Sequence, residues 1–101
     1  MSMNSKSHAV SHLVCPIAKT AEMLSDTWTI LIIKELMVSQ RRFCELEKEL
    51  SGISTRTLTL KLKKLVTEKI VEKNDIIYSL TGKGKKLKMV FDAMRAYGKC
   101  L

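Results

Sequence analysis

A short basic stretch near the middle of the chain carries side chains that could bind nucleic acid. An arginine can donate two hydrogen bonds to one guanine, serine and threonine can bond to bases or phosphates, and lysine mostly binds phosphates. If the stretch is a helix, residues three and four apart lie side by side and share one outward face. The expected contacts come from Ser54, Thr55, Arg56, Thr59, Leu60, Lys63 and Lys64. An ordinary solvated helix face is the alternative reading.

The helix is not obvious, because residues 57 to 62 read TLTLKL and alternate like a half-buried strand. The alternation stops after Leu62. Apolar residues instead recur at the spacing of a helix against a core: Leu58, Leu62, Leu65 and Val66. With Ser54 as N-cap, we predict a helix from about residue 55 to 68. On that helix Leu60 points outward, where it could touch a thymine methyl group or be exposed by chance.

Helix signals predict further helices on both sides of this one. Pro16 suits the first turn of a helix, which places Cys15 at the N-cap. The expected helices span about residues 16 to 24, 28 to 38 and 43 to 50, and a last one begins near 85. Residues 25 to 27 offer N-caps for the second helix, and residues 39 to 42 form a polar connection. Gly52 suits the left-handed C′ position after the third.

A β-hairpin is expected between the central and last helices. β-branched and aromatic runs at residues 70 to 73 and 76 to 80 flank Asn74-Asp75, which suits a tight two-residue turn. A short helix, a glycine turn and a second helix make a helix-turn-helix, and the following hairpin adds a wing. The predicted fold is mainly α with a small β-hairpin (α+β): a winged helix-turn-helix in residues 15 to 101 after a flexible arm in residues 1 to 14.

The net positive charge of the chain comes entirely from its second half. Residues 1 to 50 hold six Lys and Arg against six acids, and residues 51 to 101 hold twelve against four, so the net charge of +8 comes from the second half. A one-sided basic excess points to a polyanionic partner, with nucleic acid ahead of a membrane surface. A basic surface that only aids solubility would look the same.

Other classes of function have less support. The sequence has no apolar run near 18 residues and no secretory signal, so we expect a cytoplasmic protein without a membrane partner. Three cysteines without a C-x-x-C pair favour neither a disulfide framework nor a zinc site, and His8 and His12 are read as part of a polar terminus. No catalytic set or phosphate loop appears. We therefore expect no enzyme, metal or cofactor.

Several motifs, in order along the chain, resemble the HxlR-type branch of the MarR-like winged-helix transcription regulators. They are Cys15-Pro16, Trp28 at the start of an apolar helix, Arg42-Phe43-Cys44-Glu45-Leu46, the run from Gly52 to Leu65, and the run from Tyr78 to Gly84. The resemblance covers about residues 15 to 98. Each motif alone is weak, and it is their order and spacing that indicate the family.

This resemblance implies a homodimer, built through the terminal helices, on a near-palindromic double-stranded DNA operator. The expected interface residues are Ile17, Leu24, Leu87, Val90, Phe91 and Met94. Packing of the last helix against its own core is an alternative that does not exclude the dimer. Additional DNA contacts are expected from Arg41, Arg42 and Lys73, although the wing is shorter than in relatives and Asp75 would repel phosphate.

In several members of the resembled family the cysteine before the proline senses oxidants or electrophiles. Cys15 is therefore a candidate sensor, because the positive end of a helix dipole favours a reactive thiolate. A structural cysteine under the dimer interface is an equal alternative. The rival function for the whole chain is a winged helix that binds another protein and no specific DNA.

Overall fold

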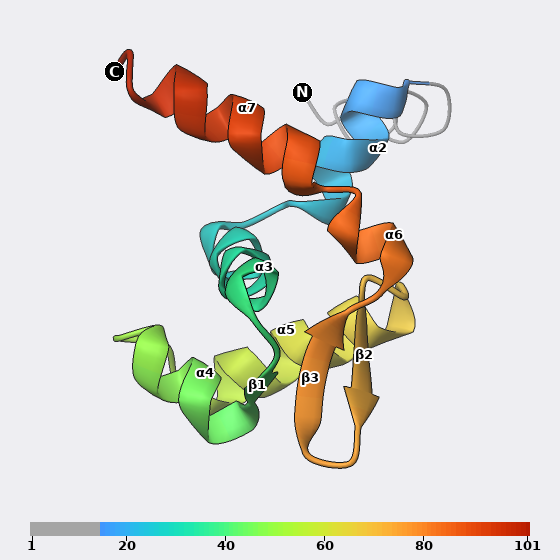
Figure 1. Cartoon of the computed structure of the whole chain (residues 1–101), viewed down its shortest axis with the longest axis vertical. Coiled ribbons are helices and arrows are strands. Elements are labelled where there is room, and N and C mark those ends of the chain that lie inside the picture. Colours follow the sequence, from blue (N-terminus) through green and yellow to red (C-terminus); the bar gives the residue numbers. More distant parts are fainter. Residues whose placement is uncertain (1–14) are drawn as a thin grey trace, which may run out of the picture.

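The computed structural model describes residues 15 to 101 as a stack of helices with a small antiparallel sheet at one side (Figure 1). The helices are α2 (Pro16–Met23), α3 (Thr27–Val38), α4 (Phe43–Glu49), α5 (Thr55–Thr67), α6 (Gly82–Lys85) and α7 (Lys88–Gly98). The strands are β1 (Arg41–Arg42), β2 (Val71–Asn74) and β3 (Ile77–Leu80), in the order β1-β3-β2. The mainly α fold with a hairpin wing is confirmed. The arm predicted for residues 1 to 14, with His8 and His12, lies outside the described residues.

The centre of the fold is α3, which lies between α7 and the α4–α5 pair (Figure 1). Its side chains Ile32 and Ile33 are fully buried, and Leu36 is nearly so. The helix begins at Asp26, whose carboxylate accepts a hydrogen bond of 2.9 Å from the backbone N–H of Thr29. This confirms an N-cap within residues 25 to 27 and explains why the apolar residues 30 to 33 form a helix. No helix within residues 15 to 101 is both long and apolar enough to cross a membrane.

The alternating stretch at residues 57 to 62 is helical, as predicted, and lies within α5. The Ser54 hydroxyl accepts a hydrogen bond of 3.0 Å from the Thr57 N–H, so it caps the helix. Leu58, Leu62 and Leu65 are at most 1% exposed and pack into the core. Val66, expected in the same stripe, is 37% exposed and lies at its margin. The helix ends where Lys69 adopts a left-handed conformation, with φ of 62°.

The wing differs from the prediction in its turn and in its number of strands. Asn74 pairs with Ile77, so the two-residue turn is Asp75-Ile76, and Asp75 supplies the positive φ of 59°. The predicted turn at Asn74-Asp75 was wrong by one residue, because Asn74 extends the strand by one pair. Residues 41 and 42, predicted to be a connection, form β1 instead and pair with Tyr78 and Ile77. A two-residue polar strand has no sequence pattern of its own.

The join between wing and last helix is a close backbone contact. Residues 82 to 84 were expected only to break the strand before a last helix from about residue 85. They instead belong to α6 (Gly82–Lys85), and α7 begins at Lys88. Thr81 caps α6 by accepting a hydrogen bond of 3.1 Å from the Gly84 N–H, and its own hydroxyl lies 2.6 Å from the carbonyl oxygen of Lys69. A Cβ at Gly84 would lie 2.2 Å from the carbonyl oxygen of Ile70. Only glycine therefore fits where α6 packs on the start of the hairpin.

Replacing Gly84 with alanine is expected to lower the free energy of unfolding by about 1–3 kcal/mol, the usual cost of overpacking a tight site. The measurement is urea denaturation followed by circular dichroism. Gly82→Ala in the same short helix is the matched control, because a Cβ there meets nothing within 4 Å. Equal stability of the two variants would contradict the contact.

Candidate nucleic-acid interface

The α4–turn–α5 unit brings the N-terminus of α5 to the surface. The chain reverses after α4 at Gly52, whose φ of +95° is strained for other residues. Gly52 lies two residues beyond the C-cap Leu50, whereas the sequence suggested the C′ position immediately after the cap. Ile53 follows and is only 8% exposed, so it fixes the turn to the core. This geometry is that of a helix-turn-helix.

The outward face of α5 is basic and free of acidic side chains. Its exposed residues include Arg56, Thr59, Leu60, Lys63, Lys64 and Thr67. No residue of α5 is an Asp or Glu. Among residues 15 to 101, no ion pair or hydrogen bond from a neighbour holds the charged groups of Arg56, Lys63 or Lys64. These three cations are therefore available to a partner.

The hydroxyl groups beside these cations already have partners within the protein. Thr55 donates to the carboxylate of Glu47 on α4, and Thr59 donates to the carbonyl oxygen of Thr55 at 2.8 Å. Thr67 does the same to the carbonyl of Lys63 at 3.0 Å. Ser54 caps the helix. The proton of Thr55 therefore ties α5 to α4, and those of Thr59 and Thr67 stay within α5, while the oxygens of these threonines remain as acceptors.

A partly buried ion pair holds α5 against α3. The amino group of Lys61 lies 2.7 Å from the carboxylate of Asp26, the N-cap of α3. Burial would raise the pKa of Asp26, but the hydrogen bonds from Lys61 and Thr29, with the charge of Lys61, outweigh it and lower that pKa. Sequence reasoning missed this pair, because no local pattern links residues 35 positions apart. It removes Lys61 from the set of free cations on α5.

The wing lies beside the C-terminal half of α5 and forms a shallow groove with it. A hollow of about 330 Å³ is lined by Thr59, Lys63, Val66, Thr67, Lys73 and Tyr78, with Phe43 and Leu62 beneath. Lys73 therefore joins the cations of α5, and its amino group lies 5.5 Å from the centre of the Tyr78 ring. Tyr78 was not among the expected site residues. Tyr78 lies in this groove because it pairs with Lys73 across the hairpin. The sequence pattern did not reveal this pairing.

The two arginines before α4 lie in different surroundings. Arg42 is exposed and lines a neighbouring hollow with Lys73 and the exposed Cys44. Arg41 is half-buried, and its guanidinium lies 3.7 Å from the carboxylate of Glu35 on α3. Arg42 is therefore presented with the wing, whereas Arg41 is engaged by the core helix.

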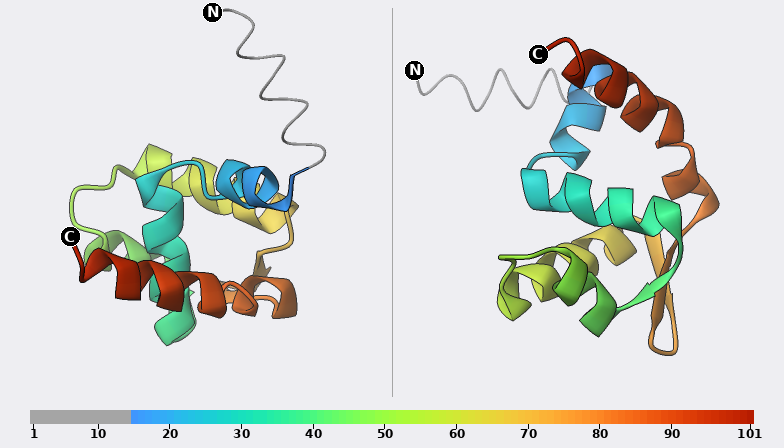
Figure 2. Two further views of the ribbon diagram at one scale, coloured as in Figure 1. Left: turned by 90° about the horizontal axis from the view of Figure 1, so that it is seen from above. Right: turned by 60° about the vertical axis from the view of Figure 1, so that its left-hand side comes forward.

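The terminal helices α2 and α7 lie at the same end of the molecule (Figures 1 and 2). Of the six expected interface residues, Leu87 and Phe91 are buried in the chain's own core, and Leu24 and Val90 pack against it. Ile17 and Met94 are exposed. The structure adds Met89, Tyr97 and Leu101 to this exposed apolar set. The first turns of α7 therefore pack on the core of the same chain, as the alternative reading expected. The second half of α7 is exposed.

Cys15 is half-buried at the N-cap of α2, where its thiol makes no capping hydrogen bond. Cys44 and Cys100 are exposed, and all three cysteines are free. A thiol is therefore present at the helix start that the sequence indicated.

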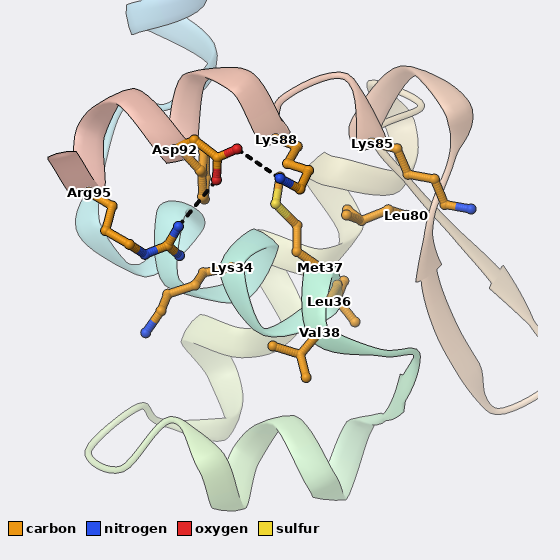
Figure 3. Close-up of a pocket in the computed structure, with 10 residues that line it drawn as sticks. Lys34, Leu36, Met37, Val38, Leu80, Lys85, Lys88, Asp92 and Arg95 are labelled. Atoms are coloured by element: carbon orange, nitrogen blue, oxygen red, sulfur yellow. Dashed lines mark hydrogen bonds and ion pairs between the residues drawn. The ribbon is translucent and has the colours of Figure 1, made fainter.

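A separate cavity of about 500 Å³ lies across α3 from α5, between α3 and the α6–α7 segment (Figure 3). Asp92 binds two of its cations, at 2.8 Å from Lys88 and 3.2 Å from Arg95. The hydrogen bond from Lys88, together with the charges of Lys88 and Arg95, lowers the pKa of Asp92, although desolvation opposes this effect. The amino groups of Lys34 and Lys85 point away from the other lining side chains. The cavity is therefore not part of the basic face of α5.

Comparison with known proteins identifies the architecture. Residues 23–101 match the family described as HxlR-like helix-turn-helix. An HTH-type transcriptional regulator of Synechocystis sp. is 37% identical over 92 residues, which span 84% of this chain and 68% of that protein. The HTH-type transcriptional regulator YodB of Bacillus subtilis is 34% identical over 96 residues, 87% of this chain and 86% of YodB.

Solved structures agree with these sequence matches. The crystal structure of quinone-bound YodB superposes with a TM-score of 0.81 at 36% identity, over 86% of this chain and 100% of that one. YodB structures in reduced and diamide-treated forms also match. A MarR-family transcriptional regulator of Porphyromonas gingivalis W83 gives a TM-score of 0.80 at 29% identity, over 85% of this chain and 91% of that one. The winged helix-turn-helix geometry and these matches together show that the chain is a transcriptional regulator and belongs to the HxlR-like helix-turn-helix family.

Proposed function

We propose that this regulator binds a specific double-stranded DNA sequence by placing α5 in the major groove. The observation that carries the proposal is the outward face of α5, where Arg56, Lys63 and Lys64 are exposed and unpaired on a helix without acids. A helix of this kind after a tight turn enters the major groove in many DNA-binding proteins, with its first residues at the base edges. Arg56 reads a guanine, and Lys63 and Lys64 bind phosphates.

The wing and the N-cap of α4 add further cations to this proposed contact surface. Lys73 lies beside Lys63 in the groove between wing and α5, and Arg42 lies on the other side of Lys73. Both cations suit phosphates that flank the groove occupied by α5. A protein with this role acts on the chromosome, and we place it in the cytoplasm for that reason.

The regulator acts as a homodimer on a near-palindromic operator. Support comes from the exposed apolar side chains on α2 and α7, where Ile17 is 80% and Tyr97 is 69% exposed. The second half of α7 extends past the core (Figure 2), and an amphipathic helix with an uncovered face favours a partner helix. A two-fold dimer would set its two α5 helices about 34 Å apart, one helical turn of DNA.

Cys15 makes the DNA affinity sensitive to oxidants or electrophiles. Support comes from its position at the start of α2, next to the proposed dimer surface, and from YodB, whose structures include quinone-bound and diamide-treated forms. A modified Cys15 would alter how α2 meets its partner, and thereby the spacing of the two α5 helices.

A comparison of Arg56→Ala with Lys63→Ala tests whether the outward face of α5 recognises bases. Arg56→Ala should weaken binding to the specific duplex by about 1–3 kcal/mol per half-site and relax its preference for one base pair. Lys63→Ala should weaken binding to all duplexes alike and lower the salt dependence by about one ion per protomer. Mobility-shift titrations at several salt concentrations, on specific and scrambled duplexes, measure both. Unchanged preference in Arg56→Ala would show that this face does not read bases. Only weak, salt-sensitive binding by the wild type would favour the rival protein-binding role.

Met94→Glu tests the dimer surface. A charge placed in an apolar interface is expected to raise the dimer dissociation constant at least about tenfold. Sedimentation equilibrium measures this change directly. Ile76→Glu is the matched control, because Ile76 is similarly exposed at 53% but lies in the wing turn. Dimerisation of Met94→Glu as tight as that of the wild type would exclude this part of α7 from the interface.

Cys15→Ser tests the sensor. Diamide joins two thiols as a disulfide and is itself reduced, so in a variant in which Cys44 and Cys100 are both serine it can join only the Cys15 thiols of the two protomers. The treatment is expected to lower the operator affinity of the wild type and of that variant, but not that of Cys15→Ser. The comparison uses mobility-shift titration before and after treatment, with reversal by a thiol reductant. A full response in Cys15→Ser would assign the chemistry to another cysteine and leave the DNA contacts of α5 untouched.

A further inference from the structure

Leu60 is an apolar side chain in the middle of the basic face of α5. It is 54% exposed, although every other leucine of that helix is buried. The residues one turn before and after it, Arg56 and Lys64, are exposed cations, and Thr59 and Lys63 flank it. Leu60 contributes nothing to the core, so its burial would have to come from a partner.

The surroundings of Leu60 do not resemble a protein-docking patch. The other exposed apolar residue of α5 is Val66, six positions later, and it lies at the groove with the wing. Leu60 is thus a single apolar group among cations, whereas protein interfaces have a contiguous apolar centre. The cations around Leu60 suit a polyanionic partner, and Leu60 itself suits a single apolar group on the surface of that partner.

The DNA major groove is such a surface. Its one apolar group is the C5 methyl of thymine, and apolar side chains contact it in protein–DNA complexes. The hydroxyl protons of Thr55 and Thr59 already form hydrogen bonds within the protein. In the first two turns of α5, Arg56 and Leu60 are therefore the exposed side chains that are free to contact a partner. Arg56 recognises a hydrogen-bonding base edge, and Leu60 recognises an apolar one.

We propose that Leu60 reads a thymine by contacting its C5 methyl group, next to the guanine bound by Arg56. The inference rests on the proposed function of α5. Residues four apart on a helix are separated by about 6 Å, and base pairs by about 3.4 Å. The thymine therefore lies one or two base pairs from the guanine in each half-site, on either strand.

Thymine-to-deoxyuridine substitution isolates this contact, because it removes the methyl group and leaves base pairing and the O4 acceptor intact. A specific duplex is first obtained by selection from random sequence with the full-length wild-type protein. Each thymine of a half-site is then replaced in turn, together with its symmetry mate. At one thymine we expect about a fourfold loss of affinity per half-site, near fifteenfold for both, from the burial of one methyl-sized apolar group.

Leu60→Ala completes the test as a double-mutant cycle. It should lose a similar factor on the thymine duplex and become insensitive to deoxyuridine at that one position. Leu60 is exposed, so the variant should keep the wild-type circular dichroism and thermal unfolding. Val66→Ala, on the same helix, is the control and should retain the full sensitivity.

The outcomes separate this inference from the function on which it rests. Specific binding with equal affinity for thymine and deoxyuridine at every position overturns the Leu60 contact and leaves the regulator's DNA reading intact. The same holds if Leu60→Ala keeps the wild-type sensitivity, or if Val66→Ala loses it. Recovery of no specific duplex by the wild type overturns the proposed function, and this contact with it.

Discussion

The burial of three leucines of α5 against the core is the constraint on which the rest of the structure depends. Leu58, Leu62 and Leu65 are at most 1% exposed, in one cluster with Ile32 and Ile33 of α3. Burial of a leucine contributes about 1.5–3 kcal/mol, so any rotation of α5 that exposed this stripe would be costly. Their burial sets the rotation of the helix about its axis. It therefore decides that Arg56, Leu60 and Lys63 face outward together.

Polar contacts at the start and in the middle of α5 complete its position without using the free cations of the outward face. Lys61 binds Asp26, which also caps α3, and Thr55 binds Glu47 of α4. Each contact ties α5 to a different helix. Because these groups are engaged inside the protein, the free cations are those without a structural role. A regulator with this arrangement can vary its free side chains without loss of the helix-turn-helix geometry.

The molecule has two exposed surfaces of different character, a basic one on α5 and an apolar one on α7. The close approach of Gly84 to Ile70 fixes α6 to the start of the hairpin, and Leu87 and Phe91 then anchor α7 on the core. From there α7 runs along the end of the molecule where α2 lies (Figures 1 and 2), and Met94 and Tyr97 are among its exposed residues. Helix α5 lies across α3 from that end (Figure 1). The core helix α3 thus contacts the elements that carry both surfaces.

The sequence by itself determined helices α2 to α5, the presence of a last helix, the glycine turn, the presence of a wing and the outward face of α5. Those features follow from local rules: apolar spacing, caps such as Ser54, and residues that favour turns. Tertiary structure alone decided the pairing of Arg41 and Arg42 with β3, the turn at Asp75-Ile76 and the bond between Lys61 and Asp26. It also decided that Leu87 and Phe91 belong to the core while Met94 remains exposed. Each of these depends on contacts between segments distant in sequence, whose geometry is set by the packing of the whole chain and leaves no periodic trace in the residues themselves.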